Sequence, residues 1–170
     1  MPEELIDVLD AEGNFTGVVK AKSQIHRDGD WHRAAHVWIV ASDGRVLLQR
    51  RSLRKENYPG LWDVSAAGHL SAGETAIECA VRETFEELGL RIDAGELQFL
   101  GTLRESCVLK GGAYIDNEFH EVFLVRRDVD VASLVLQDGE VDAVTLVKEL
   151  PTEGLVPHPE EYGIIAGRPK

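Results

Sequence analysis

The stretch from residue 68 to residue 90 reads GHLSAGETAIECAVRETFEELGL. Glu83, Glu86 and Glu87 are three and four residues apart, so on a helix their carboxylates share one face. Like charges at that spacing oppose helix formation, and a divalent cation would compensate for them. The opposite face carries an apolar stripe of helical period made of Ile77, Ala80, Val81, Thr84, Phe85 and Leu88. The stretch predicts a helix that is buried on one side and offers a carboxylate cluster on the other.

Glycines mark both ends of this predicted helix. Gly68 and Gly73 bracket a short polar loop before it, and Gly89 stands where a C-cap is expected. Glycine before a helix lets backbone groups approach a phosphate or a metal closely, and a helix N-terminus favours anions. The three glutamates alone equally fit an amphipathic helix with a solvated acidic face. The glycines favour a ligand site instead.

The same residues resemble the Nudix box, Gly-x5-Glu-x7-Arg-Glu-U-x-Glu-Glu-x-Gly-U, in which U is a bulky aliphatic residue. The matching positions are Gly68, Glu74, Arg82, Glu83, Glu86, Glu87, Gly89 and Leu90. Thr84 occupies the first U position and is the only departure, and its hydroxyl can bond back to the preceding turn. The resemblance implies an α/β/α sandwich in which the box forms a loop, a helix and a loop.

Length and composition predict one globular domain over residues 1–170. The chain has 44% hydrophobic and 28% charged residues, as soluble proteins do. No apolar run approaches membrane-spanning length, and the first residues, MPEEL, lack the basic region and apolar core of a signal peptide. We expect a cytoplasmic protein, monomeric or homodimeric, without a membrane partner.

Net charge and cysteine content narrow the range of partners. The formal net charge of -12 argues against a nucleic-acid polymer, whose phosphates require clustered Lys and Arg. A small phosphorylated substrate stays compatible, because a metal ion would supply positive charge locally. Cys79 and Cys107 are too few for a disulfide framework or a zinc site, so both are expected to be reduced thiols.

Strands are predicted on both sides of the box, and together they favour a mixed sheet in an α/β sandwich. An N-terminal β-hairpin is expected within about residues 1–30. The sequence Asp43-Gly44 is the strongest hairpin signal in the chain. The tail beyond Pro151 reads as irregular or as a broken short helix. The predicted strands cover residues 5–9, 15–20, 34–42, 45–51, 62–66, 97–108, 114–126 and 141–148.

A second resemblance extends beyond the box, to the isopentenyl-diphosphate isomerase branch of the same fold. It is carried by Pro59-Gly60-Leu61-Trp62 and Ala67-Gly68-His69, with Arg51 and Lys55 upstream. In that branch, two N-terminal histidines, the histidine after the box glycine and an acid-x-Glu pair hold a metal ion. The residues at comparable positions here are His26, His32, His69 and Asp116-Asn117-Glu118.

One residue of the isomerase pattern is missing. The isomerases carry a catalytic cysteine immediately before Gly-His, and this chain has Ala67. Isomerisation needs one group to protonate the alkene and another to remove a proton, and alanine does neither. Cys79 is expected to project alongside Glu86, away from the loop, so it is a poor substitute. The isomerases also relax the box glutamates, which are complete here, and both differences favour hydrolysis.

The flanking residues also have structural interpretations. Isolated histidines such as His26 and His32 more often pack than bind metal, and His36 in an apolar strand is expected to be structural. His120 and His158 carry no functional indication. The basic segment that contains Arg51 and Lys55 is either a solvated loop or a diphosphate clamp.

The family resemblance implies a metal-assisted attack of water on a diphosphate. Mg²⁺ is expected because it prefers hard oxygen ligands, with Mn²⁺ as a substitute. Glu86 and Glu87 are the implied primary ligands, joined by the Gly68 carbonyl. Glu83 is a further ligand or the base that orients the water, and Arg82 holds a neighbouring carboxylate in place.

An acid outside the box often completes such sites, and Glu118 is preferred over Glu121. These two residues are three apart on an extended strand and should face opposite ways. The substrate is left open among nucleoside diphosphates, nucleotide sugars, dinucleotides and non-nucleotide diphosphates. The alternatives are an isomerase with an unusual second group and a nucleotide-sensing domain without turnover, which the complete set of box glutamates disfavours.

Overall fold

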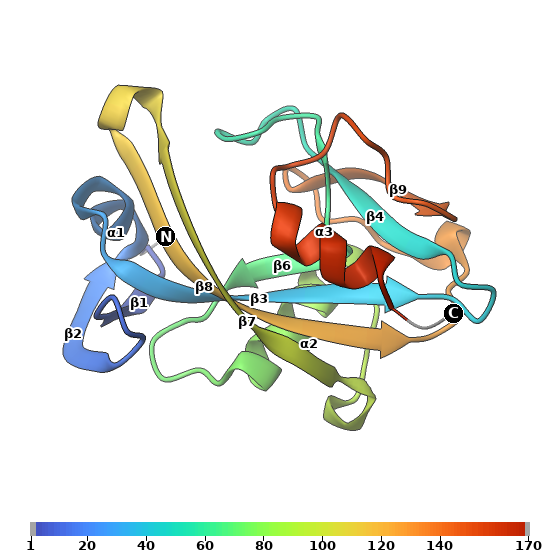
Figure 1. The fold of residues 1–170 in the computed structure, drawn as a ribbon, viewed down its shortest axis with the longest axis horizontal. Helices are drawn as coiled ribbons and strands as arrows, with labels where there is room; N and C mark the ends of the chain where they lie inside the picture. The colour runs from blue at the N-terminus through green and yellow to red at the C-terminus, as the bar shows by residue number, and fades with distance from the viewer. Residues whose placement is uncertain (1–2, 169–170) are drawn as a thin grey trace.

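A computed structural model describes residues 3–168 and shows a mixed β-sheet with helices on both faces (Figure 1). Its strands are β1 (Leu5–Leu9), β2 (Phe15–Ala21), β3 (Trp31–Val40), β4 (Val46–Arg51), β5 (Trp62–Asp63), β6 (Ala66–His69), β7 (Gln98–Leu109), β8 (Tyr114–Arg126) and β9 (Val141–Val147). Its α-helices are α1 (Lys22–Asp28), α2 (Ala76–Leu88) and α3 (Pro159–Ala166). The predicted α/β sandwich with a mixed sheet and an N-terminal hairpin is confirmed.

Strand β3 is the centre of the sheet. Along one edge it pairs in parallel with β8, from Trp31 opposite Asn117 to Val40 opposite Arg126. Its other edge is shared by β1, β6 and β4 in turn. This sharing places the box loop, which follows β6, directly beside the middle of the sheet.

The predicted hairpin between residues 34–42 and 45–51 forms only at its turn. Gly44 adopts a φ of 88°, which suits a glycine in a tight turn. Beyond the turn, Val40 opposite Val46 is the pairing between β3 and β4 in the described residues. Because β6 pairs with Ala34–Val37 on the same edge of β3, β4 diverges and pairs with β5 and β9 instead.

Alternation along β3 builds two apolar layers, as expected where both faces of a strand are buried. One face packs against α2 through Ala35, Val37 and Ile39. The other face carries Trp38 and Val40, which share a cluster with α3, and Figure 1 draws α3 in front of the sheet near β3.

Other predicted strands are confirmed with small changes. Residues 62–66 divide into β5 and β6, and the tail holds α3. Helix α1 was not predicted, because its seven residues lie between two strands and carry no long apolar period. Gly29 ends it in the left-handed conformation with a φ of 76°. None of the helices in residues 3–168 has both the length and the apolar character needed to cross a bilayer.

Helix α2 is rotated relative to the predicted stripe. Ile77 and Phe85 are 44% and 43% exposed, so their predicted burial is wrong. Glu87, by contrast, is buried beside Thr84. We attribute the rotation to Glu87, whose carboxylate turns toward the sheet and accepts hydrogen bonds from Ala67 and Gln49. The Thr84 hydroxyl donates to the carbonyl of Ala80 at 2.7 Å, as its place in the helix predicts.

Candidate functional site

The box helix α2 is capped at both ends. The Thr75 hydroxyl accepts a hydrogen bond from the Glu78 amide at 3.1 Å, and the Glu78 carboxylate accepts one from the Thr75 amide at 3.2 Å. These two bonds form a capping box. Gly89 ends the helix with a φ of 67° and donates to the Phe85 carbonyl at 2.8 Å. The caps fix where the helix starts and stops, and therefore where its carboxylates lie.

Gly68 has no space for a side chain. A Cβ atom there would lie 2.1 Å from Cδ and 2.3 Å from Oε1 of Glu83. The carboxylate of Glu83 therefore lies directly against the backbone of β6. Gly68 is thus required by close approach, since its φ is not in the left-handed region.

Arg82 ties the box carboxylates together. Its guanidinium donates to Glu74 at 2.7 and 2.8 Å, to Glu83 at 2.8 Å and to Glu86 at 3.2 Å. It also donates to the carbonyl of His69 at 3.2 Å, which anchors the loop. Charge-assisted bonds of this kind restrict the carboxylates to one arrangement.

Two of these carboxylates are desolvated. Glu87 accepts hydrogen bonds from the amide of Ala67 at 2.8 Å and from Gln49 at 3.1 Å. Burial raises the pKa of Glu83 to about 7 and that of Glu87 to about 8. Carboxylates buried next to one another are stabilised in their ionised form by a cation, and oxygen ligands suit Mg²⁺. The donor set of the box therefore fits a divalent metal ion.

A second group of potential ligands converges from four elements. It contains His26 on α1, His32 on β3, His69 on β6, and Asp116 and Glu118 on β8, with one ligand atom of each within 4.8 Å of the others. Glu118 Oε1 lies 2.9 Å from His69 Nε2 and 3.3 Å from His32 Nε2. We call these five residues the first histidine group.

Unpaired atoms show what the first histidine group lacks. His26 Nε2, His32 Nε2 and Asp116 Oδ1 are buried and, within residues 3–168, have no hydrogen-bond partner. Such orphans are rare in folded proteins and point to an ion or a water. Three imidazoles with carboxylates suit Zn²⁺ or Mn²⁺ better than Mg²⁺. The sequence thus identified residues that do come together, although they are far apart along the chain.

Glu118 is surrounded by histidines, which change its pKa. Burial alone would raise the pKa of Glu118, but hydrogen bonds from His120 and His69, together with the nearby ring of His32, lower it well below its usual range. Glu121 lies on the opposite face of β8, where it accepts from the Thr102 hydroxyl at 2.9 Å. The two acids therefore face opposite ways, as their spacing predicts.

A cavity of about 940 Å³ joins these features. Arg51 and Lys55 line it, as do the box glutamates and most of the first histidine group. Arg51 donates to the carbonyl of Asn57 at 2.9 Å, while Lys55 pairs with Glu140. Both basic residues predicted as a clamp therefore lie at the wall of the cavity, each with a partner inside the protein.

Three histidines without a predicted catalytic or ligand role line the same cavity, namely His36, His120 and His158. The spacing on β8 could have indicated His120, because Glu118 and His120 are two apart and share a face of the strand. His158 could not have been found this way, because it precedes α3 and reaches the sheet only through the tertiary fold. His36 is bonded to Glu161 of α3 at 2.9 Å.

Comparison with known proteins places this geometry in a family. A sequence model of the NUDIX domain matches residues 30–162, most of the chain. The chain belongs to the Nudix family. Members of this family generally use divalent metals, in agreement with the acidic and histidine-rich groups described above.

Named Nudix relatives include both hydrolases and isomerases. Nudix hydrolase 3 of Arabidopsis thaliana is 44% identical over 150 residues, which are 86% of this chain but 19% of the plant protein. An uncharacterised Nudix hydrolase of Clostridium acetobutylicum is 36% identical over 151 residues, covering 87% of this chain and 70% of that protein. An isopentenyl-diphosphate Delta-isomerase of Serratia proteamaculans is 33% identical over 122 residues, covering 72% and 65%. This chain thus spans about a fifth of the plant relative.

Solved Nudix structures share the fold. The MutT Nudix hydrolase from Burkholderia pseudomallei superimposes with a TM-score of 0.63 at 19% identity, covering 81% of this chain and 98% of that one. At this identity the likeness concerns architecture. The family match and the named hydrolases among the relatives support a hydrolase and confirm the resemblance to the Nudix box.

The position of Cys79 differs from the prediction. Its thiol lies 3.5 Å from the carbonyl of Gly68 and 3.4 Å from that of His69, so its expected placement away from the Nudix loop is wrong. The loop folds back over the first turn of α2, which brings Cys79 beneath it. The residue is fully buried, and burial raises the pKa of the thiol strongly. Cys79 is therefore a packing residue under the loop.

Proposed function

We propose that residues 1–170 act as one Nudix domain that hydrolyses a diphosphate linkage in a small organic or nucleoside diphosphate compound. The observation that carries this proposal is that Glu83, Glu86 and Glu87 all line the cavity, where Arg82 bonds to Glu83 and Glu86. The hydrolases among the relatives support it further.

Mg²⁺, with Mn²⁺ as a substitute, would be held by Glu86, Glu87, Glu83 and the carbonyl of Gly68. Bound there, the ion supplies charge neutralisation of the diphosphate and a more acidic water. Arg82 orients Glu83 and Glu86 by one bond to each and is itself held by two bonds to Glu74. Glu83, pressed against β6, orients the attacking water and accepts its proton.

The first histidine group would hold a separate transition-metal ion, Zn²⁺ or Mn²⁺, on the same cavity. Its three orphaned atoms support this, because each gains a partner from one central ion. Glu118 contributes the acid from outside the box. Arg51 and Lys55 bind diphosphate oxygens by exchanging their present carbonyl and carboxylate partners for phosphate.

Isomerisation of isopentenyl diphosphate is the second candidate. The first histidine group favours it, because the isomerase branch places its metal ligands at comparable positions, and an isomerase is among the relatives. Ala67 argues against it. Its amide donates to Glu87, but its methyl group moves no proton.

A release assay separates these functions. The purified chain is incubated with a panel of nucleoside diphosphates, nucleotide sugars, dinucleotides and non-nucleotide diphosphates, with Mg²⁺ or with a chelator, and products are followed by ³¹P NMR. We expect Mg²⁺-dependent cleavage of at least one panel member, and its loss in Glu86→Gln. Cleavage that persists in the chelator and in the variant would contradict the proposed roles.

A further inference from the structure

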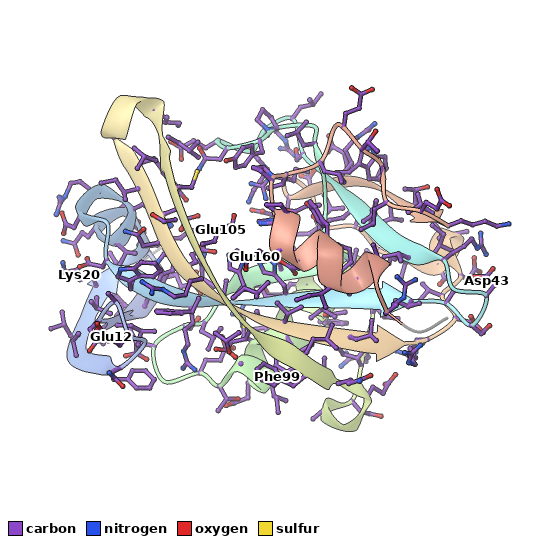
Figure 2. The ribbon with its side chains drawn as sticks, viewed as in Figure 1. Glu12, Lys20, Asp43, Phe99, Glu105 and Glu160 are labelled. Atoms are coloured by element: carbon purple, nitrogen blue, oxygen red, sulfur yellow. The ribbon has the colours of Figure 1, made fainter. Side chains whose placement is uncertain are left out.

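A second histidine group lies on the other side of Glu118 from His69, near the start of α3. It consists of Glu105 on β7, His120 on β8 and His158 just before α3, with one ligand atom of each within 4.8 Å of the others. Glu105 Oε2 lies 2.9 Å from His158 Nδ1 and 3.4 Å from His120 Nδ1. Figure 2 shows Glu105 on the side of β7 that faces α3, where His158 approaches it. Two donors of a tetrahedral metal ion with bonds of about 2.1 Å lie about 3.4 Å apart, so this spacing suits one ion.

An orphaned atom points into the second histidine group. His120 is 2% exposed, and its Nδ1 has no hydrogen-bond partner among residues 3–168. Four buried side-chain atoms in that range are unpaired in this way, and the other three are the orphans of the first histidine group. An unpaired buried ligand atom, the observation that supports a metal ion in the first histidine group, therefore also occurs in the second group.

Carboxylates hold the far side of both imidazoles. His120 Nε2 bonds to Glu118 Oε2 at 2.7 Å, and His158 Nε2 lies 3.3 Å from Asp63 Oδ1. Histidines that ligate metals usually present their other ring nitrogen to a carboxylate or carbonyl, which fixes the tautomer and the ring. Both rings here have that arrangement, and both turn Nδ1 toward Glu105.

We propose that Glu105, His120 and His158 form a second metal site, which binds one divalent transition-metal ion of the Zn²⁺ class. Two imidazoles and one carboxylate are a common ligand set for zinc with an open fourth position. All three residues line the cavity, so the open position faces the space that also contains the box glutamates. Glu161 lies 3.9 Å from His120 Nδ1 but is already bonded to His36 and Trp38.

The carboxylates around the second histidine group favour a bound cation. His158 lies between two carboxylates, 3.3 Å from Asp63 Oδ1 and 2.9 Å from Glu105 Oε2. A divalent ion bound by Glu105, His120 and His158 would neutralise this negative charge. A site of this kind does not depend on which reaction the box catalyses.

Metal stoichiometry tests the site without any substrate. The metal-free chain is titrated with Co²⁺, a spectroscopic substitute for Zn²⁺, and visible absorption and bound metal are measured. The variants are Glu105→Gln and His158→Gln for the second group and His69→Gln for the first. Glu121→Gln is the matched control, because this acid lies beside His120 but on the opposite face of β8. Thermal unfolding in chelator checks that each variant folds.

We expect His158→Gln and Glu105→Gln each to lose one equivalent of Co²⁺, or to bind it at least tenfold more weakly. His69→Gln should keep that equivalent, and Glu121→Gln should match the wild type. If both second-group variants bind as much Co²⁺ as the wild type with the same affinity, the site is only a protonated hydrogen-bond network and the inference is wrong. Loss of catalysis in Glu86→Gln, with the Co²⁺ equivalent that His158→Gln loses still bound, keeps the two proposals separate.

Discussion

Replacement of Gly68 by alanine tests how the box works, because it adds one methyl group at a known place. The new Cβ would lie 2.1 Å from the Glu83 carboxyl carbon, whereas ordinary contacts start at 3.4 Å. The carboxylate must therefore retreat by more than 1 Å. It cannot do so freely, because Arg82 holds it at 2.8 Å and also binds two other glutamates.

The expected cost can be divided between folding and catalysis. Gly68 has no positive φ, so alanine causes no backbone strain, and overpacking should lower the free energy of unfolding by about 1–3 kcal/mol. Displacing a catalytic group by about 1 Å costs about 100-fold in rate. We therefore expect kcat to fall at least about 100-fold while the variant still folds.

Steady-state hydrolysis of the best panel substrate, with urea unfolding in parallel, measures both effects. The matched control is Gly95→Ala, because a Cβ at Gly95 meets nothing within 4 Å and the φ there is not positive. The control should keep wild-type kcat. A wild-type kcat in folded Gly68→Ala would refute the claim that the position of Glu83 against β6 governs turnover.

Three further outcomes follow from buried groups. Glu87→Gln should keep the fold, because the amide oxygen can still accept from Ala67 and Gln49, but its turnover with Mg²⁺ should fall by about 100-fold or more from the lost ligand charge. Glu161→Ala should lower the free energy of unfolding by about 3 kcal/mol, since it strands buried His36 and Trp38. In native protein, thiol reagents should modify half-buried Cys107 well before fully buried Cys79.

Each of these outcomes has a control. Glu121→Gln should keep turnover, and near wild-type turnover in Glu87→Gln would contradict its role as a ligand. Glu160→Ala, one residue from Glu161 and exposed, should change stability by less than about 0.5 kcal/mol, and an equal loss in both variants would contradict the importance of the buried contacts. Labelling of both cysteines at one rate in native protein, as in urea, would contradict the burial of Cys79.

Most of the fold could be predicted from patterns of residues that are close together in the sequence. Caps, turns and period identify α2 and the Asp43-Gly44 turn, because these depend on neighbouring residues. The rotation of α2 could not be predicted, because it follows from a bond between Glu87 and Ala67, which are on different elements. An apolar stripe assigns Phe85 to the core, yet its ring lies outside beneath Arg91.

The candidate site was predictable only where a known motif supplied the pattern. His26, His32 and His69 were found through the resemblance to the isomerases, and the fold does bring them together. The second histidine group was missed. Its members are joined by the β7 and β8 register, which sets Glu105 opposite Glu118, and by a tail that returns His158 to the sheet. The spacing of residues along the sequence predicts neither contact.

Hydrolysis in ¹⁸O-labelled water tests the central claim most directly. Isopentenyl diphosphate and the best panel substrate are incubated separately with the protein and Mg²⁺, and the products are analysed by mass spectrometry and NMR. We predict one ¹⁸O atom per cleavage event, carried on a phosphate product of the panel substrate, and no dimethylallyl isomer above background, because Ala67 cannot move a proton. Robust formation of the isomer, with no ¹⁸O in any phosphate product, would contradict the assignment as a hydrolase and leave the Nudix fold unchanged.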